Sequence, residues 1–280
     1  MRSDKMLFVV GNSRSGTTMM GRILGNHSDV FTFGELHFFG QLWSPNLTSG
    51  LNETEAIELA SKLFCIQRVG YRKQGDTRDF QVDAQEFCAD FSDYPVSPTK
   101  LFSTFLQSET NLNDKSIPCD QTPRNVFYID EILKVYPQAK IINMIRDPRD
   151  VLLSQKRKWQ RRFLGGTDLP LIESLRDWIN YHPLTISRIW HTAVNTADRF
   201  SKCDKVYTVY FEQLLSSPEK TVADLCRFVD IEYTPCMLQV PQVGSSVDSD
   251  KPTTTGINPN RAGNWNVNST YESKLNSSEI

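Results

Sequence analysis

The sequence predicts an α/β protein of three layers, in which a central parallel sheet has helices on both faces. Three short apolar runs have the length and composition of strands that are buried on both sides: Met6–Val10, Lys140–Ile145 and Val206–Tyr210. Between them lie segments in which apolar residues recur at helical spacing. Strands that alternate with helices are typical of a parallel sheet, because parallel strands need a crossover connection.

The expected helices follow the strands along the chain. Thr17 opens the first helix, in which Met20, Ile23 and Leu24 share one face. Pro123 opens another at a position where the missing N–H of proline costs nothing. The expected helices cover residues 17–26, 53–67, 123–136, 148–162 and 218–229.

Length and composition indicate one globular domain over residues 1–280. Of the 280 residues 39% are apolar and 23% are charged, which excludes a disordered or fibrous chain. The 31 Lys and Arg residues against 33 Asp and Glu residues give a net charge of −2, which argues against a dedicated nucleic-acid binder. Residues 239–280 are polar and form either an ordered flap or a surface tail.

The sequence also bears on location and cysteine chemistry. Its apolar runs are too short for a signal peptide or a membrane span, so we expect no membrane contact and a cytoplasmic location. The six cysteines lack CxxC or framework spacing, which predicts free thiols. No cluster of His and Cys suggests a metal site.

The strongest functional signal is the segment Gly11–Thr18, which follows a strand and precedes a helix. Two glycines bracket a turn whose backbone N–H groups can point inward, and the start of the helix adds partial positive charge. Such a loop holds an anion, most often phosphate, and predicts a P-loop-type variant of the α/β fold. Gly-x4-Gly alone would also suit an ordinary turn, but the Arg, Ser and Thr residues favour an oxyanion.

The same loop argues against an ATPase. Nucleotide-binding loops of that class end in Gly-Lys-Ser/Thr, and here Thr17 stands at the place of the lysine. The cation of this loop is Arg14, whose guanidinium suits a trigonal oxyanion bound by forked hydrogen bonds.

A second anion anchor begins where the strand Lys140–Ile145 ends. Arg146 stands at the carboxyl end of that strand, where α/β proteins bind ligands. Ser154 lies eight residues further, two turns along the following helix, and can face the same side. A solvated, salt-bridged helix start is the alternative for this segment taken alone.

Together the two anchors resemble the sulfotransferases that use 3′-phosphoadenosine-5′-phosphosulfate (PAPS), in particular the bacterial and protein-tyrosine-sulfotransferase-like branch. The resemblance covers Leu7 to about Glu232 and extends more loosely to Trp265. It implies that the 5′-phosphosulfate is bound by Arg14, Ser15, Gly16, Thr17 and Thr18. It implies that the 3′-phosphate is bound by Arg146 and Ser154, with Lys158 at a position where some relatives have an arginine.

Further positions carry over from the same resemblance. Glu35, which follows Gly34, matches the general base that takes the proton of the acceptor, and His37 is a fallback base. Tyr210 or Phe211 matches an aromatic residue near the adenine, and plain core packing is the alternative. Arg261 belongs to a segment that resembles the C-terminal closure over the nucleotide, so residues 239–280 are expected to provide that closure.

The sequence departs from the family pattern at two places. Gln121 stands where relatives often have a lysine that helps the leaving group, and an amide cannot supply that charge. Phe33 stands where the secreted branch has a cysteine that pairs with one near residue 119, so Cys119 is expected to be a free thiol.

The predicted function is therefore a cytoplasmic PAPS-dependent sulfotransferase that releases 3′,5′-adenosine bisphosphate (PAP) and needs no metal. The acceptor is expected to be a hydroxyl or amine of a small molecule from secondary metabolism, and no nucleic-acid or membrane partner is expected. The oligomeric state stays open. The alternatives are a P-loop kinase or NTPase and a silent nucleotide-binding module. Aromatic candidates for the acceptor pocket are Phe38, Phe39, Trp43, Trp159, Phe163, Trp178, Tyr181 and Trp190.

Overall fold

Five parallel strands form the sheet of this protein. The structure is a computed structural model, and it describes residues 5–45, 49–71, 75–157, 181–241, 255–263 and 275. The described strands are β1 (Leu7–Gly11), β2 (Val30–Thr32), β3 (Ile117–Asp120), β4 (Lys140–Ile145) and β5 (Val206–Tyr210). They lie in the order β2-β3-β1-β4-β5, and every pairing is parallel. The three predicted strands are confirmed, and β2 and β3 extend the sheet beyond β1.

The described helices are α1 (Thr17–Gly25), α2 (Glu53–Val69), α3 (Gln81–Cys88), α4 (Pro98–Leu112), α5 (Ile129–Val135), α6 (Pro148–Lys156), α8 (Pro183–Asp198), α9 (Phe211–Ser216) and α10 (Pro218–Phe228). Shorter helical turns are η1 (Phe38–Leu42), η2 (Thr77–Phe80), η3 (Pro123–Tyr128), η5 (Pro235–Leu238) and η6 (Pro259–Arg261). The predicted helices over 17–26, 53–67 and 218–229 are confirmed to within a few residues. The one predicted over 123–136 consists of the turn η3 followed by α5. The one predicted over 148–162 is α6, and residues 158–162 lie outside the described part.

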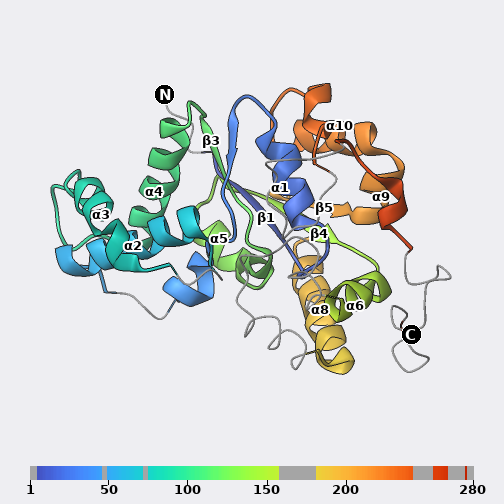
Figure 1. Cartoon of the computed structure of the whole chain (residues 1–280), viewed down its shortest axis with the longest axis horizontal. Coiled ribbons are helices and arrows are strands. Elements are labelled where there is room, and N and C mark those ends of the chain that lie inside the picture. Colours follow the sequence, from blue (N-terminus) through green and yellow to red (C-terminus); the bar gives the residue numbers. More distant parts are fainter. Residues whose placement is uncertain are drawn as a thin grey trace.

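Helices cover both faces of the sheet, so the three-layer prediction is confirmed (Figure 1). Side chains alternate along a strand, and β1 therefore sends Leu7 and Val9 to one face and Phe8 and Val10 to the other. Leu7 and Val9 belong to a core with residues of α1, α9 and α10. Phe8 and Val10 belong to a second core with residues of α4, α5 and α8.

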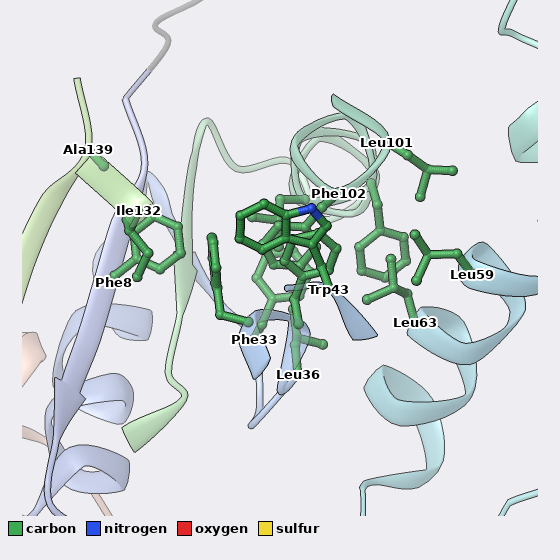
Figure 2. Packing of buried hydrophobic residues seen from close by; sticks show 14 of the residues in the cluster. Phe8, Phe33, Leu36, Trp43, Leu59, Leu63, Leu101, Phe102, Ile132 and Ala139 are labelled. Atoms are coloured by element: carbon green, nitrogen blue, oxygen red, sulfur yellow. The ribbon is translucent and has the colours of Figure 1, made fainter. Parts of the chain in front are cut away.

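The second core extends past the sheet into a group of helices formed by α2, α3 and α4. In Figure 2, Leu59 and Leu63 of α2 face Leu101 and Phe102 of α4, with Trp43 beside them. Trp43, and likewise Phe38 and Phe39, is buried by this packing. The prediction that these three residues are candidates for the acceptor pocket is therefore replaced by a role in the core.

The parallel sheet gathers five loops at one edge. The carboxyl ends of the strands are Gly11, Thr32, Asp120, Ile145 and Tyr210, and each is followed by a segment with polar or charged residues. Ligands of α/β proteins bind at this edge. Among the described residues, the structure has no helix of the length and apolar character needed to cross a membrane.

Candidate functional site

The loop between β1 and α1 has the conformation of an anion-binding turn. Gly11, Arg14 and Gly16 have φ values of 142°, 75° and 94°, so the backbone turns back on itself before the helix begins. The first bond within the helix runs from the Met20 N–H to the Gly16 carbonyl, at 3.0 Å. The N–H groups of Thr17 and Thr18 precede that bond and stand at the positive end of α1. The predicted loop is thus built at the carboxyl end of β1.

The structure brings the two predicted anchors into direct contact. The Arg14 Nε donates a hydrogen bond of 2.9 Å to the Ser154 Oγ, across 140 residues of sequence. Ser154 lies on α6, which follows β4, and the whole of β1 is paired with β4. The expectation that Ser154 faces the ligand side of its helix is consistent with this contact.

Arg146 lies in the middle of this site. Its side chain is 12% exposed, and its guanidinium carbon lies 4.5 Å from the centre of the Phe211 ring. Its Nη1 donates to the Arg14 carbonyl at 3.3 Å and its Nη2 to the Arg261 carbonyl at 2.7 Å. Asp150 lies 3.7 Å from the same Nη2. The guanidinium thus joins the loop, the start of α6 and the C-terminal segment.

Neighbouring elements also hold the backbone around Arg146. The Trp190 Nε1 of α8 donates to the Arg146 carbonyl at 3.0 Å. The Asp147 N–H donates to the Glu212 Oε1 of α9 at 2.9 Å. Trp190, a candidate for the acceptor pocket from the sequence, therefore contacts the second anchor.

The electrostatics of the site favour an anion. Burial lowers the pKa of the Arg146 guanidinium from its ordinary value, Asp150 and Glu212 oppose this effect, and Arg261 adds to it. Burial likewise lowers the pKa of Arg22, and repulsion from Arg261 lowers it further. Because arginine stays charged at neutral pH, these guanidinium groups are held together at a cost that a bound anion would offset.

Two buried polar atoms at the anchors have no hydrogen-bond partner in the described part of the chain. Among the described residues, five buried side-chain polar atoms have no hydrogen-bond partner, and two of them, the Ser15 Oγ and the Arg146 Nε, lie at the anchors. Unpartnered buried polar groups are rare because they lose their bonds to water. The Ser15 Oγ lies in the loop after β1, and the Arg146 Nε lies in the second anchor. Because both atoms can donate a hydrogen bond, they suit a ligand that has one anionic group at each anchor.

The C-terminal segment reaches this site. Apart from the Arg261 carbonyl, the Gly263 N–H contacts the second anchor, donating at 2.8 Å to the Asp150 Oδ2. Residues 261–263 therefore lie against the start of α6. The other residues of the predicted closing segment, 242–254 and most of 264–280, lie outside the described part, as does Lys158.

Glu35 and His37 lie in the segment that follows β2. The Glu35 side chain is 48% exposed, whereas that of His37 is 9% exposed, and the His37 Nε2 lies 3.2 Å from the Glu35 Oε2. The His37 ring also packs on the Tyr71 ring, with centroids 4.1 Å apart. Glu35, the predicted base, and His37, its predicted fallback, therefore form one pair, in which the Glu35 carboxylate is accessible to solvent.

The carboxyl end of β3 meets both parts of the site. The Gln121 Nε2 donates to the Thr17 Oγ1 of the loop at 3.4 Å. The Thr122 Oγ1 accepts from the His37 N–H at 3.3 Å and donates to the Asp120 Oδ1 at 2.7 Å. Sequence reasoning found Gln121 by its departure from the family but assigned no role to Asp120 and Thr122, which flank it in the same segment.

The two aromatic candidates at the end of β5 differ in their surroundings. Tyr210 is 47% exposed, whereas Phe211 is 3% exposed and lies between Gly16 and the Arg146 guanidinium. Phe211 therefore packs beneath the anchors, and the exposed ring is that of Tyr210. All six cysteines are free thiols, Cys119 among them. In the described part of the chain, no group of three His, Cys, Asp or Glu residues could hold a metal ion.

Comparison with known proteins identifies the family. Residues 7–235 match the family model described as "Sulfotransferase family", and the chain belongs to this family. It is 24% identical over 254 residues to a putative protein-tyrosine sulfotransferase of Caenorhabditis briggsae, covering 88% of this chain and 72% of the relative. It is 23% identical over 249 residues to protein-tyrosine sulfotransferase 1 of Danio rerio, covering 83% of this chain and 55% of the relative. An uncharacterized protein of Aquifex aeolicus is 25% identical over 245 residues, which are 85% of this chain and 27% of that protein.

Solved structures show the same fold. The sulfotransferase domain of the Synechococcus PCC 7002 olefin synthase aligns over 95% of this chain and 90% of its own, with a TM-score of 0.58 and 16% identity. The sulfotransferase domain of the curacin biosynthetic pathway aligns over 98% and 96%, with a TM-score of 0.56 and 18% identity. The chain thus has the P-loop-like α/β fold of sulfotransferases.

Proposed function

We propose that this protein is a PAPS-dependent sulfotransferase that acts on a hydroxyl or amine of a small-molecule acceptor. The observation that carries the proposal is the hydrogen bond between Arg14 and Ser154, beside the unpartnered Ser15 Oγ and Arg146 Nε. Two adjacent anion sites suit a nucleotide that carries charged groups on both its 5′ and 3′ oxygens. Membership of the sulfotransferase family supports sulfuryl transfer over phosphoryl transfer.

In this proposal each anchor binds one end of the cofactor. Arg14, Ser15 and the start of α1 hold the 5′-phosphosulfate, while Arg146 and Ser154 hold the 3′-phosphate. Thr17 and Thr18 add hydroxyl donors to the first site, and Arg261 and Tyr210 border the nucleotide. Bound PAPS supplies the sulfuryl group, and PAP is the product that remains.

The protein's own part in the reaction falls to Glu35 and Arg14. Glu35 accepts the proton of the acceptor, and its exposed carboxylate is reachable from solvent. His37 orients that carboxylate through the contact at 3.2 Å. Arg14 and the N-terminus of α1 stabilise the negative charge that develops beside them. The Gln121 amide binds Thr17 but supplies no charge, so more of this stabilisation rests on Arg14 than in relatives with a lysine.

The acceptor is proposed to be a small metabolite in the cytoplasm. Two relatives are named protein-tyrosine sulfotransferases. Peptides that contain tyrosine are therefore the acceptors whose transfer rates should be compared with those of small metabolites.

Calorimetric binding of PAP tests the cofactor. We expect micromolar binding by the unaltered protein and a loss of at least about a hundredfold in Arg146→Ala, because a buried charge-assisted contact is removed. Arg149→Ala is the matched control. Arg149 lies three residues away, and its guanidinium bonds to Asp147 in the same turn, so this variant removes equal charge while leaving the Arg146 contacts in place.

Two outcomes would point to the other functions. Binding of ADP with Mg²⁺ in place of PAP would indicate the kinase. Binding of PAP without transfer from PAPS to any alcohol, phenol, amine or tyrosine peptide would indicate the silent module. If transfer occurs, Glu35→Gln should lower kcat by about two orders of magnitude and leave PAP affinity within about twofold.

A further inference from the structure

A buried acid that the proposed reaction does not use lies directly behind the Glu35 and His37 pair. Asp120, at the carboxyl end of β3, is 0% exposed. Its Oδ1 accepts from the Thr122 hydroxyl at 2.7 Å and its Oδ2 from the Asn125 amide at 2.9 Å. A buried carboxylate costs free energy unless it is well bonded, so its presence here calls for an explanation.

The acid determines the direction of the Thr122 hydroxyl. A hydroxyl has one proton to donate, and an ionised carboxylate can only accept. With its proton given to Asp120, the Thr122 oxygen presents lone pairs to the other side. There it accepts the His37 N–H at 3.3 Å.

That hydrogen bond holds an unusual backbone conformation. His37 has a φ of 53°, in the left-handed region that few residues other than glycine adopt. The turn places the His37 ring against the Glu35 carboxylate at 3.2 Å and against Tyr71. A shift of the His37 backbone would therefore change the contact between the ring and the carboxylate.

The same stretch of chain contacts the other half of the site. Gln121, between Asp120 and Thr122, donates to Thr17 of the loop. Three consecutive residues thus link the loop, the buried acid and the turn of Glu35. For in-line transfer the acceptor oxygen or nitrogen must fit between the base, which takes its proton, and the sulfur that it attacks. The base therefore has to stand at a fixed place relative to the loop, and errors of about 1 Å can cost a hundredfold in rate.

We propose that Asp120 and Thr122 are positioning residues, which hold the turn of Glu35 and His37 at a fixed place relative to the anion-binding loop. The inference rests on the proposed function for its role in transfer. Its structural part, that Thr122 holds the turn, concerns the ligand-free chain alone.

The charge of Asp120 adds a second effect on the same pair. Glu35 and His37 act on Asp120 from the segment after β2, Tyr136 faces it from the end of α5, and Cys119 precedes it in β3. Burial raises the pKa of Asp120 to about 6, and the bonds from Thr122 and Asn125 oppose the rise. At neutral pH the acid is therefore mostly ionised and acts as the acceptor that the geometry requires.

The test compares Thr122→Val with Thr122→Ser. Valine keeps the shape of threonine but removes the hydroxyl, whereas serine keeps the hydroxyl. In the ligand-free protein, we expect the His37 amide to exchange with solvent about tenfold faster in Thr122→Val than in Thr122→Ser. PAP affinity should agree within about twofold, and kcat per folded molecule should be about tenfold lower in Thr122→Val.

Asp120→Asn provides a second measurement, should Thr122→Val not fold. Asp120 has a pKa of about 6, so in the unaltered protein the acceptor for the Thr122 hydroxyl loses its charge as pH falls through that value. The variant has no such titration, so the acidic limb of the transfer rate against pH should move to lower pH. Equal His37 exchange in the two Thr122 variants, or equal kcat together with an unmoved acidic limb in Asp120→Asn, would overturn the proposal. Failure of the unaltered protein to bind PAP would instead refute the proposed function, and the exchange experiment would still decide whether Thr122 holds the turn.

Discussion

Gly16 shows how tightly single residues are constrained at the entrance to α1. Its φ of 94° is unfavourable for any residue with a Cβ atom. A Cβ at this position would lie 2.4 Å from the Phe211 ring, which itself packs against the Arg146 guanidinium. The absence of a side chain therefore allows the loop, Phe211 and the second anchor to approach one another.

Gly16→Ala should lower the free energy of unfolding by about 2–4 kcal/mol, from the combined cost of the left-handed backbone and of the overlap with Phe211. Urea unfolding measures it. The control is Gly34→Ala, where a Cβ would meet no atom within 4 Å. Equal stability of the two variants would show that the loop accommodates a side chain at Gly16.

Asp120 makes the stability depend on pH in a defined direction. Its pKa is raised from 3.8 to about 6 in the folded protein, so the folded state holds a proton that the unfolded state has already lost. The contribution of this group to stability is greatest below its unfolded pKa and is lost as pH rises through about 6. The loss is on the order of 2–3 kcal/mol.

Asp120→Asn lacks this titration. Relative to the unaltered protein, the variant should therefore gain stability between about pH 4 and pH 7, as measured by urea unfolding across that range. Parallel curves for the two proteins would show that Asp120 titrates alike in the folded and unfolded states.

At the scale of elements, α6 and the loop after β1 act together through one hydrogen bond. The Arg14 Nε donates to the Ser154 Oγ. A hydroxyl of the second anchor, on α6, is thus bonded to the guanidinium of the first anchor. The segment around Arg146 is in turn held by α8 through Trp190 and by α9 through Glu212. These contacts define where α6 begins relative to the loop.

Ser154→Ala should weaken PAP binding about tenfold, because it removes a hydroxyl from the proposed 3′-phosphate site and the acceptor from Arg14. Gln155→Ala, one residue further along the same helix, should leave the affinity within about twofold. Calorimetry of both variants measures the difference. Equal loss in both would indicate an effect on α6 as a whole and no specific role for the hydroxyl.

The elements that could be predicted share long or strongly patterned sequences. β1, β4 and β5 are apolar runs of five or six residues, and α1 and α10 have clear apolar faces. β2 has three residues, and β3 has four with a proline among them, so neither carries a recognisable pattern. Both become strands because neighbouring segments pair with them, which is a tertiary effect.

At the scale of the whole molecule, the strand order decides which segments meet. β1 lies between β3 and β4, so the loop after β1 stands between Gln121 and Thr122 on one side and Arg146 on the other. The helices α2, α3 and α4 lie together beside the sheet, and Tyr71, just after α2, packs on His37 (Figure 1). The site is thus bordered by loops from every strand and by the end of one outlying helix.

The sequence by itself determined the α/β class, three of the strands and the family to which the chain belongs, and it predicted both anion anchors. These depend on local patterns: apolar runs, glycines around a turn, and an arginine placed at the end of a strand. The contact between Arg14 and Ser154, the burial of Phe211 under Arg146 and the bonds that link Asp120, Thr122 and His37 were decided only by the tertiary structure. They join residues from different strands and loops, and the pairing of parallel strands, which no local pattern encodes, is what brings those residues within hydrogen-bonding distance.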